Sequence, residues 1–380
     1  MNQKKKYFFI ITFLINLVLI VFLLLILERH LKITDLKLRE ETLKKETHRK
    51  QNIDRDLIKK AKQKKYFPIV QPWMFRQYPN LKNTISDVPP LGGKPFRKNY
   101  MCNEGYGLIK YKSDRFGYRN NDNIWSNINL KKNKILIIGD SFGAGACVKD
   151  NDTISSNLNG ISFNLSMPGN DPYMYNSLLN VFAEYVSPKK IIIIIYSNDF
   201  IIYENDIYDN KNIKKNKYIC NNYLCDEIIK ILNNAENFLI QQNLDRGKEP
   251  NFFSKLKVYL TFPIIREKII FIKKKYLFHS ITPILNKLIH NSVQHCKRLN
   301  CEVTFVYIPN SNSYRPDQIA NENKKLLEKK LNESNVSFID MSKLFKDYTE
   351  KEIYALSGSH LSPKGYKLVA DEINYKIAKK

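Results

Sequence analysis

From Lys134 to the C-terminus, the sequence alternates short apolar runs with longer stretches of helical character. Five of these runs have strand length, namely ILIIG, ISFNL, IIIIIY, VTFVYI and VSFID. Continuous apolar strands are typical of a parallel sheet that is covered by helices on both faces. The alternation of strands and helices favours the same arrangement. We therefore expect an α/β fold with a flavodoxin-like, doubly wound sheet of five parallel strands.

Changes in composition divide the chain into five segments. They are a basic tail at 1–6, an apolar run at 7–27, a charged segment at 28–65, a segment rich in Pro, Gly and aromatic residues at 66–130, and the α/β domain at 131–380. The charged segment has neither Gly nor Pro and predicts a helical stalk. The next segment predicts irregular structure with short strands. We interpret 201–280 as an insertion after the third strand.

The apolar run at 7–27 predicts a membrane-spanning helix. It contains no charged residue and has about the 20 residues that a helix needs to cross the hydrocarbon core. A cleaved signal peptide would have a shorter apolar region and a small-residue cleavage site. We therefore expect an N-terminal transmembrane helix that acts as an uncleaved, single-pass signal anchor. Lysine and arginine flank both of its ends, so charge alone does not set its orientation.

The cysteines favour an oxidising compartment. Two pairs have equal spacing, and the six residues are Cys102, Cys147, Cys220, Cys225, Cys296 and Cys301. An even number with close pairs is typical of disulfide-bonded proteins outside the cytoplasm, although the sequence does not give the connectivity. Six reduced structural cysteines are the alternative. A zinc site built from the last pair with His290 and His295 does not match the usual ligand spacings, and we expect neither a metal nor a cofactor.

The net charge of +25 raises the question of an acidic partner. The basic residues are scattered, and no zinc finger, RNP-type motif or helix-turn-helix signal accompanies them, so we expect no nucleic-acid partner. A stretch rich in lysine and aromatic residues at 252–278 has two interpretations. It is either a membrane-surface helix or a helix that packs its apolar face on the core.

Polar residues follow several predicted strands, where ligands bind in an open parallel sheet. Ser141 follows the first strand, Gly169 the second and Asn198 the third. A nucleophilic serine needs a base and donors for the oxyanion. The backbone N–H groups of Ser141 and Gly169 and the side-chain amide of Asn198 are candidate donors. Taken singly, Ser141 and Asn198 are also plausible helix caps, and Gly169 a turn glycine.

His360 is the candidate base. It precedes Ser362, a plausible helix cap, and Pro363, which suits a first helical position. This places it beyond the same edge of the sheet as Ser141, although a solvated loop histidine is the alternative. The remaining histidines lie in the predicted stalk or around the helix before the fourth strand, where packing or surface roles suffice. They are His30, His48, His279, His290 and His295.

Four blocks of sequence, GDSF, the glycine of NLSMPGND, the Asn-Asp pair at 198–199 and HLSPKGY, resemble the four blocks of the SGNH/GDSL hydrolase family in order. The phrase DRFGYRN before GDSF is similar to bacterial members. The resemblance implies Ser141 as nucleophile, His360 as general base, and Ser141, Gly169 and Asn198 as the oxyanion hole.

Two features depart from the pattern of that family. The acid that usually precedes the histidine by two or three residues is absent, because Gly358 and Ser357 stand there. The acid then comes from elsewhere, a backbone carbonyl replaces it, or activity is lost. The nearest acidic candidates in sequence are Asp340, Asp347 and Glu352. In addition, Tyr196 and Ser197 stand where a glycine usually precedes the asparagine of the third block.

These observations favour a membrane-anchored serine esterase. We expect it to remove an O-acyl group, O-acetyl above all, from an envelope glycan or a lipid-linked sugar. One alternative is an O-acetyltransferase that modifies an envelope polysaccharide and receives acetyl from a membrane acyl-donor protein. Another is an inactive module that binds a glycan or a partner protein. The expected location is the cytoplasmic membrane, with the catalytic domain on the periplasmic side.

Overall fold

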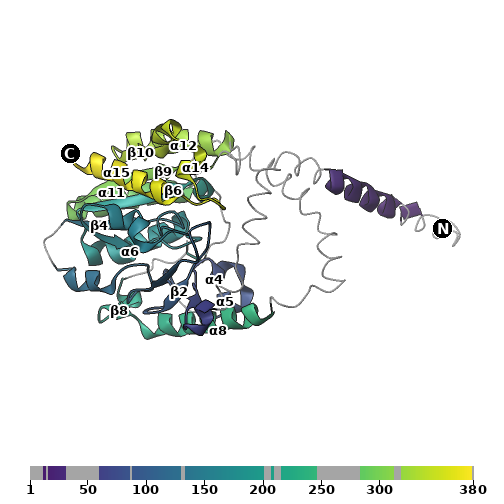
Figure 1. The fold of residues 1–380 in the computed structure, drawn as a ribbon, viewed down its shortest axis with the longest axis horizontal. Helices are drawn as coiled ribbons and strands as arrows, with labels where there is room; N and C mark the ends of the chain where they lie inside the picture. Colours follow the sequence, from purple (N-terminus) through teal and green to yellow (C-terminus); the bar gives the residue numbers. More distant parts are fainter. Residues whose placement is uncertain are drawn as a thin grey trace, which may run out of the picture. The chain divides into compact units, whose positions relative to one another are not determined.

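The computed structural model of this protein describes residues 12–13, 16–30, 60–85, 88–129, 133–200, 207–208, 215–245, 283–311 and 318–378. The chain divides into two units. One contains Met1–Lys44 and Leu244–His279, and the other contains Lys45–Asn243 and Ser280–Lys380. All strands of the described residues belong to the second unit (Figure 1).

The first unit contains an N-terminal apolar helix. Thr12–Phe13 and Asn16–His30 are helical, and apolar side chains such as Val18 and Leu23 are largely exposed. Among the described residues, no helix combines the length and the apolar character needed to cross a membrane. Parts of the predicted anchor at 7–27 and most of the predicted stalk at 28–65 lie outside the described residues. Both stay predictions.

Five parallel strands form the main sheet of the second unit, in the order β10-β9-β6-β4-β5. Their bounds are β4 (Lys134–Ile138), β5 (Ile161–Asn164), β6 (Lys190–Tyr196), β9 (Glu302–Ile308) and β10 (Ser337–Asp340). The first of these strands in the chain therefore lies between the second and the third. This is the flavodoxin-like order of a doubly wound sheet, and it confirms the predicted fold class.

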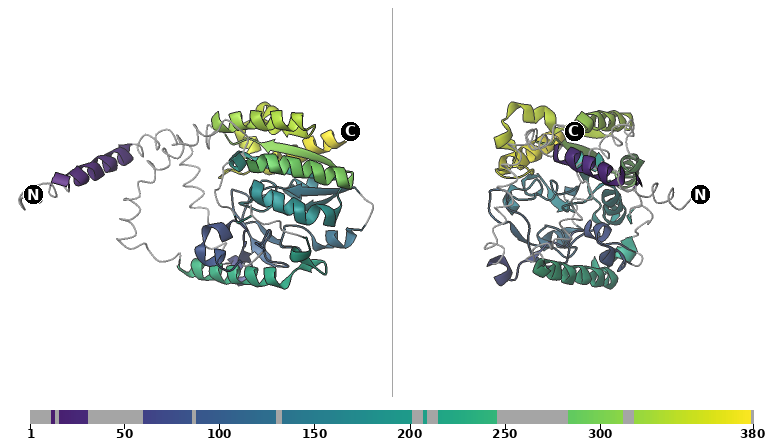
Figure 2. Two further views of the ribbon diagram at one scale, coloured as in Figure 1. Left: turned by 180° about the vertical axis from the view of Figure 1, so that it is seen from behind. Right: turned by 90° about the vertical axis from the view of Figure 1, so that its right-hand side faces the viewer.

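Helices cover both faces of this sheet (Figure 2). In β4, Leu136 and Ile138 face one core, whereas Ile135 and Ile137 face the other, as the pleat of a strand requires. The first core includes residues of α6 (Pro172–Val186), α11 (Pro283–Leu299) and α12 (Gln318–Glu333). The second includes residues of α13 (Met341–Leu344), α14 (Glu350–Ile353) and α15 (Pro363–Ala378).

The sequence around α6 explains where this helix begins and ends. The Asp171 side chain accepts hydrogen bonds from the N–H groups of Tyr173 and Met174, and Pro172 occupies the first turn. Ser187 follows the helix in the left-handed conformation, with φ of 48°, which is the usual way to close a helix. Asp171 also forms an ion pair with Arg76, at 2.6 Å.

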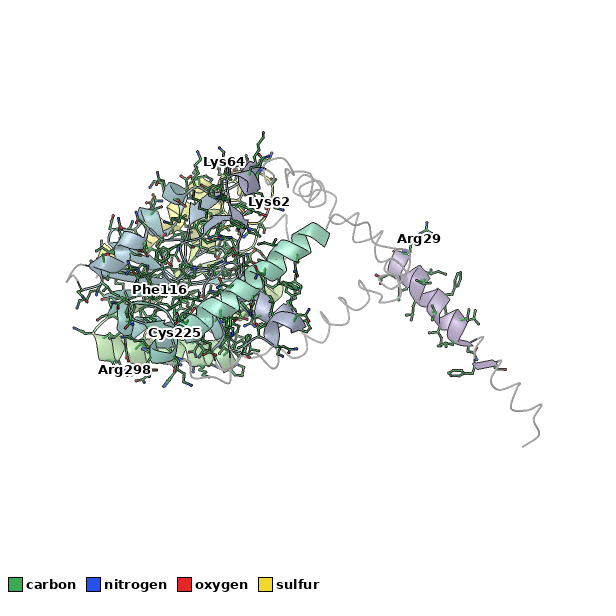
Figure 3. All side chains as sticks on the ribbon, turned by 90° about the horizontal axis from the view of Figure 1, so that it is seen from below. Arg29, Lys62, Lys64, Phe116, Cys225 and Arg298 are labelled. Atoms are coloured by element: carbon green, nitrogen blue, oxygen red, sulfur yellow. A yellow bond between two sulfur atoms is a disulfide. The ribbon has the colours of Figure 1, made fainter. Side chains whose placement is uncertain are left out.

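The segment before the main sheet contains a small sheet of its own and packs into the first core. Its elements are β1 (Phe67–Pro68), α4 (Met74–Gln77), α5 (Pro79–Lys82), β2 (Lys98–Tyr100), β3 (Lys110–Lys112) and η1 (Asp122–Asn127). Figure 3 labels Phe116 of this segment. The centroid of its ring is 4.6 Å from that of Trp125 and 5.4 Å from that of Phe182 in α6. This segment therefore shares a core with the α/β domain.

All six cysteines form disulfides, in the pairs Cys102–Cys147, Cys220–Cys225 and Cys296–Cys301. The predicted disulfides are confirmed, and the alternative of reduced cysteines is wrong. A zinc site with Cys296 and Cys301 as ligands is also excluded, because the sulfur atoms of these two residues are bonded to each other.

The described part of the predicted insertion forms a hairpin and a helix, and the lysine-rich stretch at 252–278 lies outside the described residues. The elements are α7 (Lys215–Tyr218), β7 (Ile219–Cys220), β8 (Tyr223–Leu224) and α8 (Asp226–Asp245). The described residues of the second unit also contain the 3-10 turns η2 (Asp150–Asp152), η3 (Ser155–Asn157), η4 (Ser197–Phe200) and η5 (Phe345–Asp347).

Candidate active site

The segment Gly139–Cys147, which we call the nucleophile turn, carries Ser141 directly beyond the C-terminal end of β4. It consists of turns, and no α-helix begins in it. Asp140 Oδ1 accepts the N–H of Phe142 at 2.9 Å, and the carbonyl of Ser141 accepts the N–H of Ala146 at 2.9 Å. The interpretation of Ser141 as a helix cap is therefore wrong. The Ser141 side chain is half-buried at the edge of the sheet.

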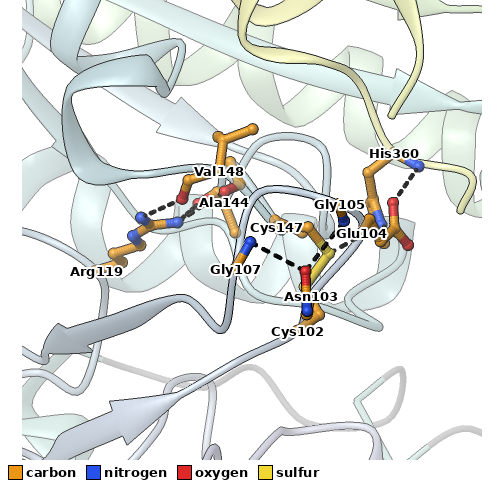
Figure 4. The surroundings of a disulfide bond; sticks show 12 residues. Cys102, Asn103, Glu104, Gly105, Gly107, Arg119, Ala144, Cys147, Val148 and His360 are labelled. Atoms are coloured by element: carbon orange, nitrogen blue, oxygen red, sulfur yellow. Dashed lines mark hydrogen bonds and ion pairs between the residues drawn. A yellow bond between two sulfur atoms is a disulfide. The ribbon is translucent and has the colours of Figure 1, made fainter. Parts of the chain in front are cut away.

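The motif DRFGYRN supports this turn from outside. Arg119 is 9% exposed, and its guanidinium donates to the carbonyl oxygens of Gly145 at 2.7 Å and Val148 at 2.8 Å (Figure 4). It also pairs with Asp150. The carbonyls of a turn without helical bonds need such donors when they are buried. Arg119 thus holds the C-terminal half of the nucleophile turn in place.

His360 lies beside the nucleophile turn. Its ring centroid is 5.2 Å from that of Phe142, and its Nδ1 is 3.6 Å from Cys147 Sγ. The predicted cap is confirmed, because Ser362 Oγ accepts the N–H of Gly365 at 3.0 Å and α15 begins at Pro363. Within the described residues, no hydrogen bond joins His360 to Ser141. Catalytic hydrogen bonds are often long before substrate binds.

Glu104 supplies the carboxylate that the sequence lacks near His360. Its Oε1 lies 2.9 Å from His360 Nδ1, and its Oε2 accepts the backbone N–H of His360 at 3.1 Å (Figure 4). The Glu104 side chain is only 4% exposed. Because a carboxylate only accepts hydrogen bonds, Nδ1 carries the proton of a neutral His360 and Nε2 is left as the basic nitrogen.

Gly358 makes room for this carboxylate. Its φ is +146°, and a Cβ atom at this position would lie 2.0 Å from Glu104 Cδ. The backbone N–H of the neighbouring Ser357 donates to the carbonyl oxygen of Glu104 at 3.1 Å. The space that a side chain at position 358 would occupy is therefore filled by the carboxyl group of another segment.

The acids nearest to His360 in sequence have other roles. Asp340 pairs with Lys324 at 2.9 Å and caps α13. Glu352 pairs with Lys364 at 2.6 Å and accepts the N–H of Thr349. Neither contacts His360, and Asp347 lies in η5. Glu104 was missed because it precedes the sheet. The sequence offers only a partial signal, the neighbouring Cys102, because its pairing with Cys147 of the nucleophile turn is known from the structure alone.

The predicted oxyanion donors follow three neighbouring strands. Ser141 follows β4, Gly169 lies beyond β5, and Asn198 is exposed in η4 directly after β6. Gly169 has φ of +78°, and a Cβ atom there would lie 2.1 Å from Trp73 Cδ1. The glycine thus lets an indole pack directly against the backbone. Their roles as donors stay predictions.

Two carboxyl groups, those of Asp140 and Asp199, are buried beneath this edge of the sheet. Burial raises the pKa of Asp140 to about 6, although backbone N–H groups and the charge of His360 lower it. Burial, followed by the charge of Asp140, raises the pKa of Asp199 well above its ordinary value. Asp199 accepts the hydroxyl of Tyr175 at 2.9 Å and the N–H of Tyr196 at 2.8 Å. These bonds fix the backbone on either side of Asn198.

Glu104, Cys147 and His360 bring three ligand atoms within 4.8 Å of one another. The sulfur of Cys147 is bonded to Cys102 and so offers no thiolate to a metal. The remaining two groups are already hydrogen-bonded to each other. The arrangement is that of a histidine oriented by a carboxylate beside the nucleophile turn.

The fold and this arrangement together define a flavodoxin-like α/β domain with serine, histidine and glutamate at the carboxyl edge of its sheet. The sequence matches no protein-family model and no curated protein. Solved structures with some likeness include three bacterial proteins. A lipase/acylhydrolase from Enterococcus faecalis is 15% identical, with a TM-score of 0.35, and the match covers 65% of this chain and 95% of that one. A member of the lipolytic protein G-D-S-L family from Veillonella parvula is 13% identical, with a TM-score of 0.35, and the match covers 65% of this chain and 99% of that one. A GDSL-like lipase from Bacteroides thetaiotaomicron is 11% identical, with a TM-score of 0.33, and the match covers 65% of this chain and 88% of that one.

Proposed function

We propose that this protein is a serine esterase of the SGNH type, which cleaves an O-acyl ester through an acyl-enzyme on Ser141. One observation carries the proposal, namely the hydrogen bond of 2.9 Å between Glu104 and Nδ1 of His360, beside the turn that presents Ser141. A buried carboxylate on one imidazole nitrogen orients the ring and leaves the other nitrogen basic, as a nucleophilic serine requires.

The reaction takes place in two half-reactions. His360 Nε2 accepts the proton of Ser141 Oγ as this oxygen attacks the ester carbonyl. The oxyanion that forms is held by the N–H groups of Ser141 and Gly169 and the amide of Asn198. His360 then gives the proton to the leaving alcohol, and the acyl group stays on Ser141. Water attacks the acyl-enzyme with His360 as base, which releases the carboxylic acid and regenerates the serine.

Glu104 stabilises the charged imidazole in both half-reactions. It accepts from Nδ1–H and from the backbone N–H of His360, so the ring has one orientation. The only observation that favours an inactive binding module is the absence of an acid close to His360 in the sequence. Because Glu104 supplies this acid in the structure, that observation no longer supports an inactive module.

The proposed substrate is an O-acyl group, O-acetyl above all, on an envelope glycan or a lipid-linked sugar, outside the cytoplasmic membrane. Three disulfides support a compartment where disulfides persist. An apolar helix with exposed side chains at Asn16–His30 supports attachment to a membrane. We keep the single-pass anchor as part of this proposal.

Covalent labelling tests the proposal. The full-length protein, kept in a mild detergent, is incubated with a fluorophosphonate, and its intact mass is measured. We expect one adduct on the wild type, none on Ser141→Ala, and strongly slowed labelling of His360→Ala. His290→Ala, which changes an exposed histidine of α11, is the matched control and should label normally. A folded wild type that gains no adduct would rule out the esterase.

The same preparation separates hydrolysis from transfer. With 4-nitrophenyl acetate as acyl donor, an esterase releases acetate at a rate that added sugar alcohols do not change. A transferase turns over faster with a sugar acceptor than with water and yields the acetylated sugar, because its pocket holds a second alcohol and excludes water.

A further inference from the structure

The disulfide Cys102–Cys147 connects the two halves of the proposed active site. Cys102 stands two residues before Glu104, and Cys147 ends the nucleophile turn that begins beside Ser141. The two Cα atoms are 5.1 Å apart, although 45 residues separate them in the chain. Figure 4 shows the bond lying between the loop of Glu104 and the turn. The disulfide therefore links the loop that carries Glu104 covalently to the turn that carries Ser141.

The disulfide also lies against the base. Cys147 is fully buried and has φ of +65°, a conformation that is uncommon for residues other than glycine. Its Sγ is 3.6 Å from Nδ1 of His360, the same nitrogen that Glu104 contacts. The sulfur therefore fills the space next to the Glu104–His360 hydrogen bond, where water would otherwise compete for the proton.

The other contacts of the Glu104 loop are either local or made with the segment 356–360, through Ser357, His360 and the backbone of Leu356. Met101 and Cys102 exchange backbone hydrogen bonds with Ile109 at the base of the loop, at 2.9 and 3.1 Å. Asn103 Oδ1 accepts the N–H groups of Gly105 and Gly107, both at 3.0 Å. These bonds shape the loop, but they do not connect it to the nucleophile turn.

From this geometry we propose that Cys102 and Cys147 are positioning residues, and that their disulfide holds Glu104 on His360 beside the nucleophile turn. The inference rests on the proposed function and specifies how its site is assembled. Loss of the bond leaves the Glu104 loop with its local contacts and with its hydrogen bonds to Ser357 and His360. It removes the link to the nucleophile turn, so the loop persists while the carboxylate shifts relative to that turn. Misplacement of a catalytic group by about 1 Å can cost about 10²-fold in rate.

Two double variants of the full-length protein test this inference. In Cys102→Ala/Cys147→Ala the proposed positioning bond is absent. In Cys220→Ala/Cys225→Ala, the matched control, the disulfide that closes the β7–β8 hairpin is absent instead. Alanine is chosen because serine would place a hydroxyl beside Nδ1 of His360. Each variant is compared with wild type by its Tm, its kcat and KM with 4-nitrophenyl acetate, and its NMR spectrum.

We expect the first variant to lose about 10²-fold in kcat with little change in KM. The proton on Nδ1 of His360, seen in ¹⁵N-histidine-labelled protein and assigned with His360→Gln, should lose its protection from exchange. The control variant should keep the wild-type kcat and the protection of the Nδ1 proton from exchange. The inference is overturned if Cys102→Ala/Cys147→Ala keeps the wild-type kcat and the protected Nδ1 proton. It is also overturned if the control variant loses kcat and proton protection to the same extent.

Should the first variant fail to fold, stepwise reduction of the wild type gives the same answer. Dithiothreitol passes two electrons and two protons to a disulfide and is itself oxidised to its cyclic disulfide. Mass spectrometry identifies which bond is open when the Nδ1 proton is lost. If the proton survives opening of Cys102–Cys147 in folded protein, the inference fails. If the wild type neither labels nor hydrolyses, yet the proton depends on this bond, the proposed function fails and the inference stands.

Discussion

Glu104 and Gly358 occupy complementary space beside the imidazole of His360. A Cβ atom at position 358 would lie within 2.3 Å of all three atoms of the Glu104 carboxyl group. Position 358 therefore holds a glycine for a steric reason.

Gly358→Ala should displace Glu104 and lower kcat strongly, because the new methyl group and the carboxylate cannot both fit. Gly107→Ala is the matched control. Gly107 also has a positive φ, +85°, but a Cβ atom there would meet nothing within 4 Å. Both positions have a positive φ, so a side chain strains the backbone in both variants and both should lower Tm. Only Gly358→Ala should lower kcat, and equal kcat values in the two variants would contradict the steric role of Glu104.

Glu104→Gln should lower kcat by about 10²–10⁴-fold and leave KM nearly unchanged, because the neutral amide no longer stabilises the charged imidazole. Glu236→Gln is a suitable control, since Glu236 is also buried and pairs with Arg97 at 2.5 Å. It should affect Tm but not kcat. Steady-state kinetics with 4-nitrophenyl acetate checks both. An unchanged kcat in Glu104→Gln would show that His360 works without this acid.

The sheet could be predicted from the sequence because its signal is local. The three central strands β4, β6 and β9 are apolar runs that are buried along nearly their whole length, and β5 and β10 are buried in their second halves. Helices separate most of these runs. The positions of Ser141, Gly169 and Asn198 follow from the same pattern, because residues beyond the ends of parallel strands gather at one edge. His360 could be placed by the cap and proline that follow it.

The acid could not be predicted in this way. Glu104 lies in the loop between β2 and β3, and apolar periodicity says nothing about where such a loop docks. Its contact with His360 depends on a disulfide across 45 residues and on a glycine that leaves space for it. Cysteine connectivity cannot be read from spacing alone. The residues that determine the contact are thus distant in sequence and carry no common local pattern.

Gly169→Ala should lower kcat by about 10²-fold, as expected when one oxyanion donor is displaced. The added Cβ atom would lie 2.1 Å from Trp73 Cδ1, and φ of +78° disfavours any residue with a side chain. The donor N–H must therefore move. Kinetics with 4-nitrophenyl acetate checks this, and Trp73→Ala tests whether the indole alone matters. If Gly169→Ala keeps the wild-type kcat, Gly169 is a turn glycine and not a donor.

The stability of the protein should fall as pH rises from about 4 to 7 through the contribution of Asp114. Burial raises the pKa of this carboxyl from 3.8 to about 6, although N–H donors such as Trp125 Nε1 lower it. The folded state therefore binds this proton more tightly than the unfolded state. The stabilising contribution is complete below about pH 4 and is lost as pH rises through about 6, which amounts to about 3 kcal/mol.

Asp114→Asn should remove this contribution, so the free energy of unfolding of the variant should depend less on pH than that of the wild type between pH 4 and 7. The variant should also be less stable at pH 4, because its amide cannot accept all the donors that Asp114 accepts. Asp122→Asn is the control, since its ion pair with Arg115 lowers the pKa of Asp122 instead. Urea unfolding at several pH values checks both. If the profiles of Asp114→Asn and wild type are parallel, Asp114 titrates normally in the folded protein, and its burial is compensated by the four N–H groups that surround it.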